Sequence, residues 1–137
     1  MTQASHYVAF VYGTLMFPAV LNRLLGRVPA TAAAVLPGYA RRAVSGQHYP
    51  AIVNAPTSQV HGLLLHDITP TELALLDEYE GDQYLRTPVT VATPSGTRVR
   101  AECFVWRNEL RSNLSNADWS VEDFENNHLA HYLHQLP

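Results

Sequence analysis

An apolar, β-branched run that stops at a glycine constrains this chain more than any other feature. Residues 7–12, YVAFVY, predict a buried strand; Gly13 and Thr14 then interrupt the run, and Pro18 opens a helical pattern. An abrupt strand end leaves successive backbone N–H groups unpaired, and such groups form a small concave anion site. The stretch therefore predicts a site for a carboxylate or phosphate. A simple turn is the alternative, since glycine is favoured in turns that bind nothing.

A second segment, residues 76–86 (LDEYEGDQYLR), places several carboxylates at the end of a predicted helix, beside aromatic rings. An acidic run that contains Asp77, Glu78 and Glu80 is also typical of a solvated helix face. An anion site and a potential general base in one small chain favour an enzyme that acts on a small acidic molecule.

The composition narrows the classes of function. A chain of 137 residues, 47% hydrophobic and 15% charged, suits one folded domain spanning residues 1–137. Its formal net charge of -3 argues against a nucleic-acid-binding protein. Cys103 is the single cysteine, so an internal disulfide is excluded. No apolar run reaches about 18 residues, and no signal-peptide pattern opens the chain, so we expect a cytoplasmic protein without a membrane span.

Local patterns predict interspersed strands and helices, which favour an α+β fold over a parallel doubly wound sheet. The expected helices are residues 18–25, residues 70–79 with Thr69 as N-cap, and a single last helix over 120–133. The expected strands are 7–12, 31–36, 39–44, a short run at 49–53, 59–66, and a hairpin of 84–93 with 98–106. Pro37-Gly38 is interpreted as a turn between two of these strands.

These segments, taken in order, resemble the gamma-glutamylcyclotransferase-like superfamily, in particular its avirulence-induced-gene-like branch in plants and bacteria. The matching pieces are FVYGTLMFPAVLNRLLGR at 10–27, AVLPGYARR at 34–42, YPAIV at 49–53, GLLL at 62–65, ELALLDEYEGDQYLR at 72–86 and CFVWR at 103–107. The resemblance covers most of the chain. It implies a small mixed β-barrel flanked by helices, with a pocket at one mouth.

The resemblance also assigns site residues. The family's acid/base glutamate corresponds to Glu80, Tyr84 and Arg86 match a Tyr-x-Arg that follows it, and Tyr49 is expected to line the pocket. The family's substrate loop corresponds to Tyr12, Gly13, Thr14 and Leu15, continued by Met16 and Phe17.

The implied reaction is the cyclisation of a small gamma-glutamyl compound to 5-oxoproline, in which the substrate's own α-amine attacks its γ-carbonyl. Because the nucleophile belongs to the substrate, no cofactor or metal is expected. A binding module for a small carboxylate, built on the Tyr12–Leu15 loop, remains the alternative. The sequence indicates neither the leaving group nor the oligomeric state.

His128, His131 and His134 recur every three residues, a spacing that brings neighbouring side chains near one helix face. Two neighbouring histidines at this spacing suggest a metal site as one interpretation. The third histidine is rotated well off that face, so the pattern is interpreted as an exposed helix end.

Overall fold

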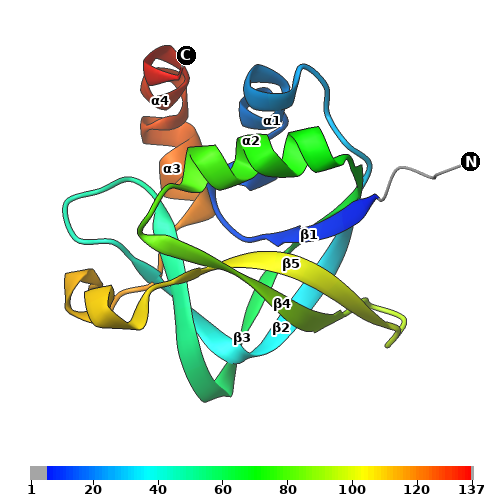
Figure 1. The fold of residues 1–137 in the computed structure, drawn as a ribbon. Helices are drawn as coiled ribbons and strands as arrows, with labels where there is room; N and C mark the ends of the chain where they lie inside the picture. The colour runs from blue at the N-terminus through cyan, green and yellow to red at the C-terminus, as the bar shows by residue number, and fades with distance from the viewer. Residues whose placement is uncertain (1–5, 137) are drawn as a thin grey trace, which may run out of the picture.

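A closed barrel of five strands forms the centre of the molecule (Figure 1). The computed structural model describes residues 6–136. The strands are β1 (Tyr7–Val11), β2 (Thr31–Ala43), β3 (Pro50–Ile68), β4 (Tyr84–Ala92) and β5 (Arg98–Trp106). Their order around the barrel is β1-β3-β2-β4-β5, and the parallel pairing of β1 with β5 closes it. The predicted α+β class, a mixed β-barrel flanked by helices, is confirmed.

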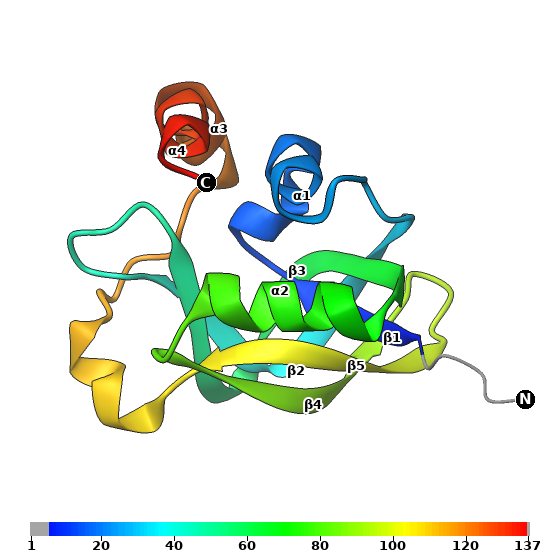
Figure 2. The same ribbon diagram turned by 45° about the horizontal axis from the view of Figure 1, so that its top comes forward.

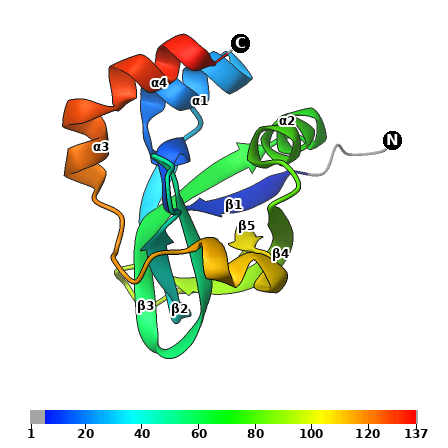
Figure 3. The same ribbon diagram turned by 90° about the vertical axis from the view of Figure 1, so that its left-hand side faces the viewer.

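In the described part of the chain, four α-helices and two short 3-10 helices lie outside the barrel. They are η1 (Thr14–Met16), α1 (Pro18–Leu25), α2 (Pro70–Glu80), η2 (Asn108–Asn113), α3 (Val121–Asn127) and α4 (Leu129–Gln135). Figures 2 and 3 show α1 beside α4, whereas α2 lies across the barrel next to β1. Helices α1, α2 and α4 therefore lie near the end of β1, whereas η2 lies apart from them (Figure 1). Within residues 6–136, no helix is both long and apolar enough to cross a bilayer.

Strand alternation divides the buried side chains between two clusters. On β1, Phe10 packs in the barrel interior with Leu36, Ile52 and Leu64. Its neighbour Val11 instead joins the cluster beneath the helices. Because successive side chains of a strand point to opposite faces, β1 contributes to both cores at once. The segment that follows β1 is consequently held from both sides.

Two predicted strand breaks are wrong. Residues 31–36 and 39–44 were expected as separate strands, but they form the single strand β2, and the runs at 49–53 and 59–66 likewise belong to β3. The ladder moves from Pro37 opposite Gln59 to Tyr39 opposite Asn54, so extra residues of β3 are accommodated where a turn was predicted. Gly38, at φ 83°, absorbs this irregularity without ending the strand.

The predicted last helix over residues 120–133 is also wrong, because it breaks at His128 into α3 and α4. His128 has non-helical backbone angles, and its ring stacks on that of His48 at a centroid distance of 4.0 Å. His128 is half-buried and so does not belong to an exposed helix end, whereas His131 and His134 are exposed as expected. The break redirects the chain so that α4 returns beside α1.

Candidate active site

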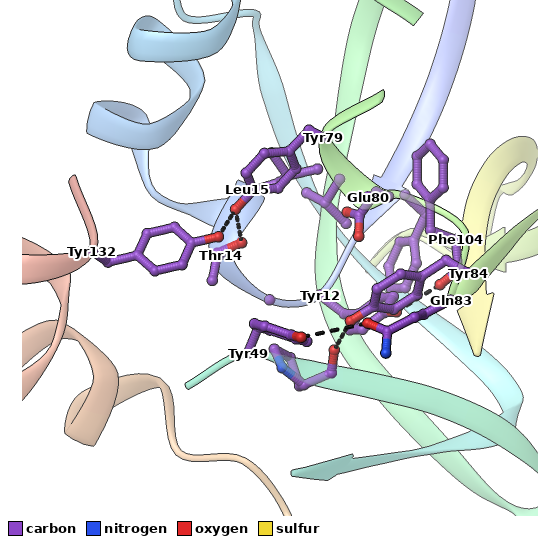
Figure 4. Close-up of a pocket in the computed structure, with 14 residues that line it drawn as sticks. Tyr12, Thr14, Leu15, Tyr49, Tyr79, Glu80, Gln83, Tyr84, Phe104 and Tyr132 are labelled. Atoms are coloured by element: carbon purple, nitrogen blue, oxygen red, sulfur yellow. Dashed lines mark hydrogen bonds between the residues drawn. The ribbon is translucent and has the colours of Figure 1, made fainter. Parts of the chain in front are cut away.

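A cavity of about 270 Å³ lies where β1 ends and α2 meets β4 (Figure 4). It is near the lower end of the range of roughly 300–1,000 Å³ found for small-molecule pockets. Its lining comes from β1 and the loop with η1 that follows it, from the start of β3, from the end of α2 and the turn into β4, and from β5 and α4. The lining residues are Phe10, Val11, Tyr12, Gly13, Thr14, Leu15, Tyr49, Pro50, Tyr79, Glu80, Gln83, Tyr84, Phe104 and Tyr132.

The loop after β1 presents free backbone donors to this cavity. Within residues 6–136, the N–H groups of Gly13, Thr14 and Leu15 make no hydrogen bond. The next two are occupied, since Met16 N–H donates to the Gly13 carbonyl at 3.0 Å and Phe17 N–H donates to the Thr14 carbonyl at 3.2 Å. Three successive free N–H groups at the wall of a cavity form the kind of site that holds an anion.

Gly13 is required by packing. A Cβ at this position would lie 2.7 Å from Cγ and 2.8 Å from Cδ of Pro50. The first residues of β3 therefore press directly against the loop, and a larger residue at position 13 would displace one or the other. The glycine serves this close backbone approach, which brings the loop and β3 into one wall of the cavity.

Glu80 is the last residue of α2, and its carboxyl group points into the cavity (Figure 4). Gly81, at φ 76°, ends the helix there, and its N–H donates to the Asp77 carbonyl. In the part of the chain that the structure describes, the Glu80 carboxylate has no ion-pair partner. Desolvation raises its pKa from an ordinary 4.5 to about 8.

Five of the chain's seven tyrosines line the same cavity as this carboxyl group. The Tyr12 hydroxyl donates to the Phe104 carbonyl at 2.6 Å, and the Tyr84 hydroxyl donates to the Pro50 carbonyl at 2.7 Å. Burial, reinforced by the charge of Glu80, raises the pKa of Tyr84 well above its usual range, and burial raises that of Tyr12. The phenols therefore stay neutral, and their hydroxyl protons point into the protein.

A chain of hydroxyl groups joins three elements on one side of the cavity. Thr14 Oγ1 and the Tyr79 hydroxyl are 2.7 Å apart, and Tyr79 also hydrogen-bonds to the Tyr132 hydroxyl (Figure 4). Thr14 belongs to the loop after β1, Tyr79 precedes Glu80 on α2, and Tyr132 comes from α4. The chain ties the free N–H groups to the helix that carries the carboxylate.

The structure brings together most of the residues that the sequence singled out. Around the one cavity lie Tyr12, Gly13, Thr14, Leu15, Tyr49, Glu80 and Tyr84. Met16 and Phe17 are not part of the lining, and Phe17 packs on Phe124 with ring centroids 5.3 Å apart. Arg86 likewise lies outside the lining, in ion pairs with Asp77 and Glu102.

Sequence reasoning missed several lining residues. Gln83 accepts a hydrogen bond of 3.5 Å from the Tyr49 hydroxyl. It lies within segment 76–86, three residues after Glu80, so its place in the sequence was a usable signal. Phe104 and Tyr132 come from β5 and α4, far along the chain, and no spacing links them to Gly13.

The donor groups of the site are those of proton transfer and anion binding. Among the described residues, no group of three histidine, cysteine or carboxylate side chains is arranged to hold a metal ion. Cys103 is buried, and desolvation raises its pKa, so its thiol stays protonated. Glu80 carries the single carboxyl group among the residues that line the cavity.

Comparison with known proteins assigns the family. Residues 9–121 match the family described as gamma-glutamyl cyclotransferase, AIG2-like. This chain belongs to that family. AIG2-like protein D of Arabidopsis thaliana is 36% identical over 126 residues, covering 90% of this chain and 82% of the relative. AIG2-like protein C of the same plant is 39% identical over 119 residues, covering 86% of this chain and 69% of the relative.

Solved structures agree with the fold of this member of the gamma-glutamyl cyclotransferase, AIG2-like family. A solution structure from Arabidopsis thaliana superposes with a TM-score of 0.76 and 29% identity, over 97% of this chain and 89% of the other. A structure named gamma-glutamyl cyclotransferase gives a TM-score of 0.70 over 96% and 86% of the two chains. At 18% identity, the similarity to this second structure concerns the fold alone.

Proposed function

We propose that this protein is a gamma-glutamyl cyclotransferase that converts a small gamma-glutamyl compound into 5-oxoproline and a free amine. One observation carries the proposal: a glutamate without an ion-pair partner among the described residues, with a pKa near 8, shares a cavity with three free backbone N–H groups. The glutamate is suited to proton transfer at neutral pH, and the N–H groups are suited to binding a carboxylate.

In the proposed mechanism, the N–H groups of Gly13, Thr14 and Leu15 bind the substrate's α-carboxylate. This contact folds the gamma-glutamyl chain back so that its α-nitrogen approaches its γ-carbonyl carbon. Positioning of this kind can supply on the order of 7–11 kcal/mol in an intramolecular reaction. The protein therefore needs no nucleophile of its own.

Glu80 handles the protons. Its carboxylate takes a proton from the substrate's α-ammonium, and the freed amine attacks the γ-carbonyl to form the lactam C–N bond. The protonated Glu80 then gives that proton to the departing nitrogen as the original amide C–N bond breaks. The regenerated carboxylate takes the second proton from the ring nitrogen, which leaves a neutral lactam, and passes it to the released amine, which departs as ammonium. Glu80 thus carries both protons and returns to its starting state with no external acid or base.

The tyrosines support this chemistry by staying uncharged. Tyr12 and Tyr84 donate their hydroxyl protons to backbone carbonyls, so they neither compete with Glu80 for protons nor add charge beside it. Their rings withdraw the carboxylate from water, and this desolvation raises the pKa of Glu80. A base whose pKa lies near the working pH transfers protons in both directions most effectively.

A small-carboxylate binding module remains the second candidate, because the loop alone would serve it. Glu80 argues against this function, since a buried negative charge repels an anionic ligand and costs stability. A binding protein would gain nothing from this residue.

The test is to incubate the pure protein with gamma-glutamyl amino acids, gamma-glutamyl amines and glutathione, and to measure 5-oxoproline by mass spectrometry. We expect product from at least one compound, none with Glu80→Gln, and full turnover with Glu78→Gln, an exposed neighbour on the same helix. Equal turnover by Glu80→Gln would remove Glu80 from the mechanism. Saturable binding of these compounds without product would favour the binding module.

A further inference from the structure

Arg41 lies directly behind the loop that carries the free N–H groups. It projects from β2, and its Nη1 donates a hydrogen bond of 3.1 Å to the backbone carbonyl of Tyr12. That carbonyl belongs to the same peptide group as the N–H of Gly13. In a trans peptide the carbonyl and the N–H point in opposite directions. The guanidinium therefore holds the outer side of the peptide whose N–H is free on the cavity wall.

The position of Arg41 is itself well defined. Its Nε and Nη2 donate to the Asp118 carboxylate at 2.9 and 3.4 Å, and its guanidinium lies 5.4 Å from the ring centroid of Trp119. Only 16% of its side chain is exposed. A cation so withdrawn from water acts on its neighbours with little screening.

The charge of Arg41 matters because the cavity lining contains no lysine, arginine or histidine. A carboxylate bound at the loop would meet only neutral donors and the Glu80 carboxyl group, which is negative when ionised. A hydrogen bond at the carbonyl polarises the peptide group and strengthens the N–H as a donor. The guanidinium thus delivers positive potential to the anion site through one peptide bond, without entering the cavity.

We propose that Arg41 is a positioning residue that makes the loop selective for a carboxylate. It aims and polarises the peptide between Tyr12 and Gly13, so that a ligand with a carboxylate binds more tightly than the same ligand with a carboxamide. This inference rests on the proposed function, in which the loop holds the substrate's α-carboxylate. Asp118 and Trp119 contribute indirectly, because they hold the Arg41 guanidinium in place.

The experiment measures dissociation constants of 5-oxoproline and 5-oxoprolinamide by NMR titration of the protein. The quantity compared is the carboxamide-to-carboxylate ratio of the two constants within one variant, which does not depend on the fraction of folded protein. For the parent we expect a clear preference for the carboxylate. In Arg41→Gln the ratio should fall about tenfold, while Arg41→Lys, which retains the charge without the planar fork, should lie between the two.

Arg42→Gln is the matched control. Arg42 is the next residue on β2 and is also half-buried, but its Nη1 donates to the carbonyl of Arg41 and not to that of Tyr12. The carboxamide-to-carboxylate ratio of Arg42→Gln should equal that of the parent. An equal fall in Arg42→Gln would reduce the effect to general surface charge and overturn the inference.

Two other outcomes separate this inference from the proposed function. A parent that forms 5-oxoproline and prefers the carboxylate, with an unchanged ratio in Arg41→Gln, would overturn the role of Arg41 alone. A parent that shows no turnover of any gamma-glutamyl compound and no carboxylate preference would overturn both proposals.

Discussion

Helix α2 carries a buried or half-buried glutamate at each end, and the two have opposite environments. Glu72, in the first turn, closes a capping box with Thr69 and accepts two hydrogen bonds of 2.7 Å from Arg27. These bonds lower its pKa. Glu80, the last residue, has no charged partner among residues 6–136, and desolvation raises its pKa to about 8.

The difference shows how position on a helix separates structural from chemical carboxylates. The N-terminal end offers free N–H groups and a positive dipole, both of which stabilise the charged form of Glu72. The C-terminal end offers neither, so a carboxylate there keeps its affinity for protons. One stabilises the fold and the other is available for proton transfer.

The largest expected effect separates the two glutamates by activity. Glu80→Gln should lower kcat by about 10²–10⁴-fold, the usual contribution of a general acid/base, with its fold retained. Glu72→Gln should keep the parent's kcat per folded molecule. Steady-state assays on protein checked by circular dichroism measure both, and a matching loss in the two variants would erase the distinction.

The stability of Glu80→Gln should change in the opposite direction to its activity. Because the folded state raises the pKa of Glu80 from 4.5 to about 8, the folded protein binds a proton that the unfolded chain releases, and it loses stability as pH rises through this window. Glu80→Gln removes this loss, so its advantage in free energy of unfolding should grow by up to roughly 1.4 kcal/mol per pH unit. Urea unfolding at pH 5, 7 and 9 measures the trend; a constant difference would contradict it.

The pH dependence of turnover is the third expectation. Since Glu80 must be ionised to accept a proton, kcat/KM should rise about tenfold per pH unit below an inflection near pH 8. The inflection in kcat should lie lower, because the bound ammonium favours the charged carboxylate. An inflection near pH 4.5 in kcat/KM would show an ordinary, solvated carboxyl group.

The smallest effect concerns Glu72. Its Gln variant should lose about 1 kcal/mol of stability at pH 7, a modest value because the partner Arg27 is 44% exposed and its charge is screened by water. The lowered pKa of Glu72 means that this contribution is present above the ordinary pKa and disappears as pH falls through the lowered one. Thermal melts at pH 7 and pH 3 should show a smaller difference at pH 3 than at pH 7.

Local chemistry made part of this molecule predictable. The helix over 18–25, the N-cap at Thr69 and the helix end at Gly81 follow from proline, threonine and glycine acting on their own neighbours. The breaks in β2 and β3 were mispredicted, because Pro37 and Gly38 also suit a strand irregularity when a long partner strand supplies hydrogen bonds on both sides.

The site was predictable where one short segment supplies it. Gly13 stood out because it ends a predicted strand, and residues 76–86 stood out because their carboxylates lie at the end of a predicted helix. The choice of Glu80 among those carboxylates came from the family resemblance. Tyr132 and Arg41 were not predictable, because their roles depend on hydrogen bonds to Tyr79 and to the Tyr12 carbonyl across the fold. Such contacts follow from closure of the barrel and leave no mark in local spacing.

The pairing of β1 has a consequence for how the chain folds. Among residues 6–136, the partners of this first strand are Leu63–Ile68 of β3 and Glu102 and Cys103 of β5. Contacts so distant along the chain form slowly, because a long loop must close before they are made. The free N–H groups after β1 therefore take their final place only once β5 is docked. We expect ligand affinity to be among the last properties recovered during refolding, which makes binding a sensitive measure of complete folding.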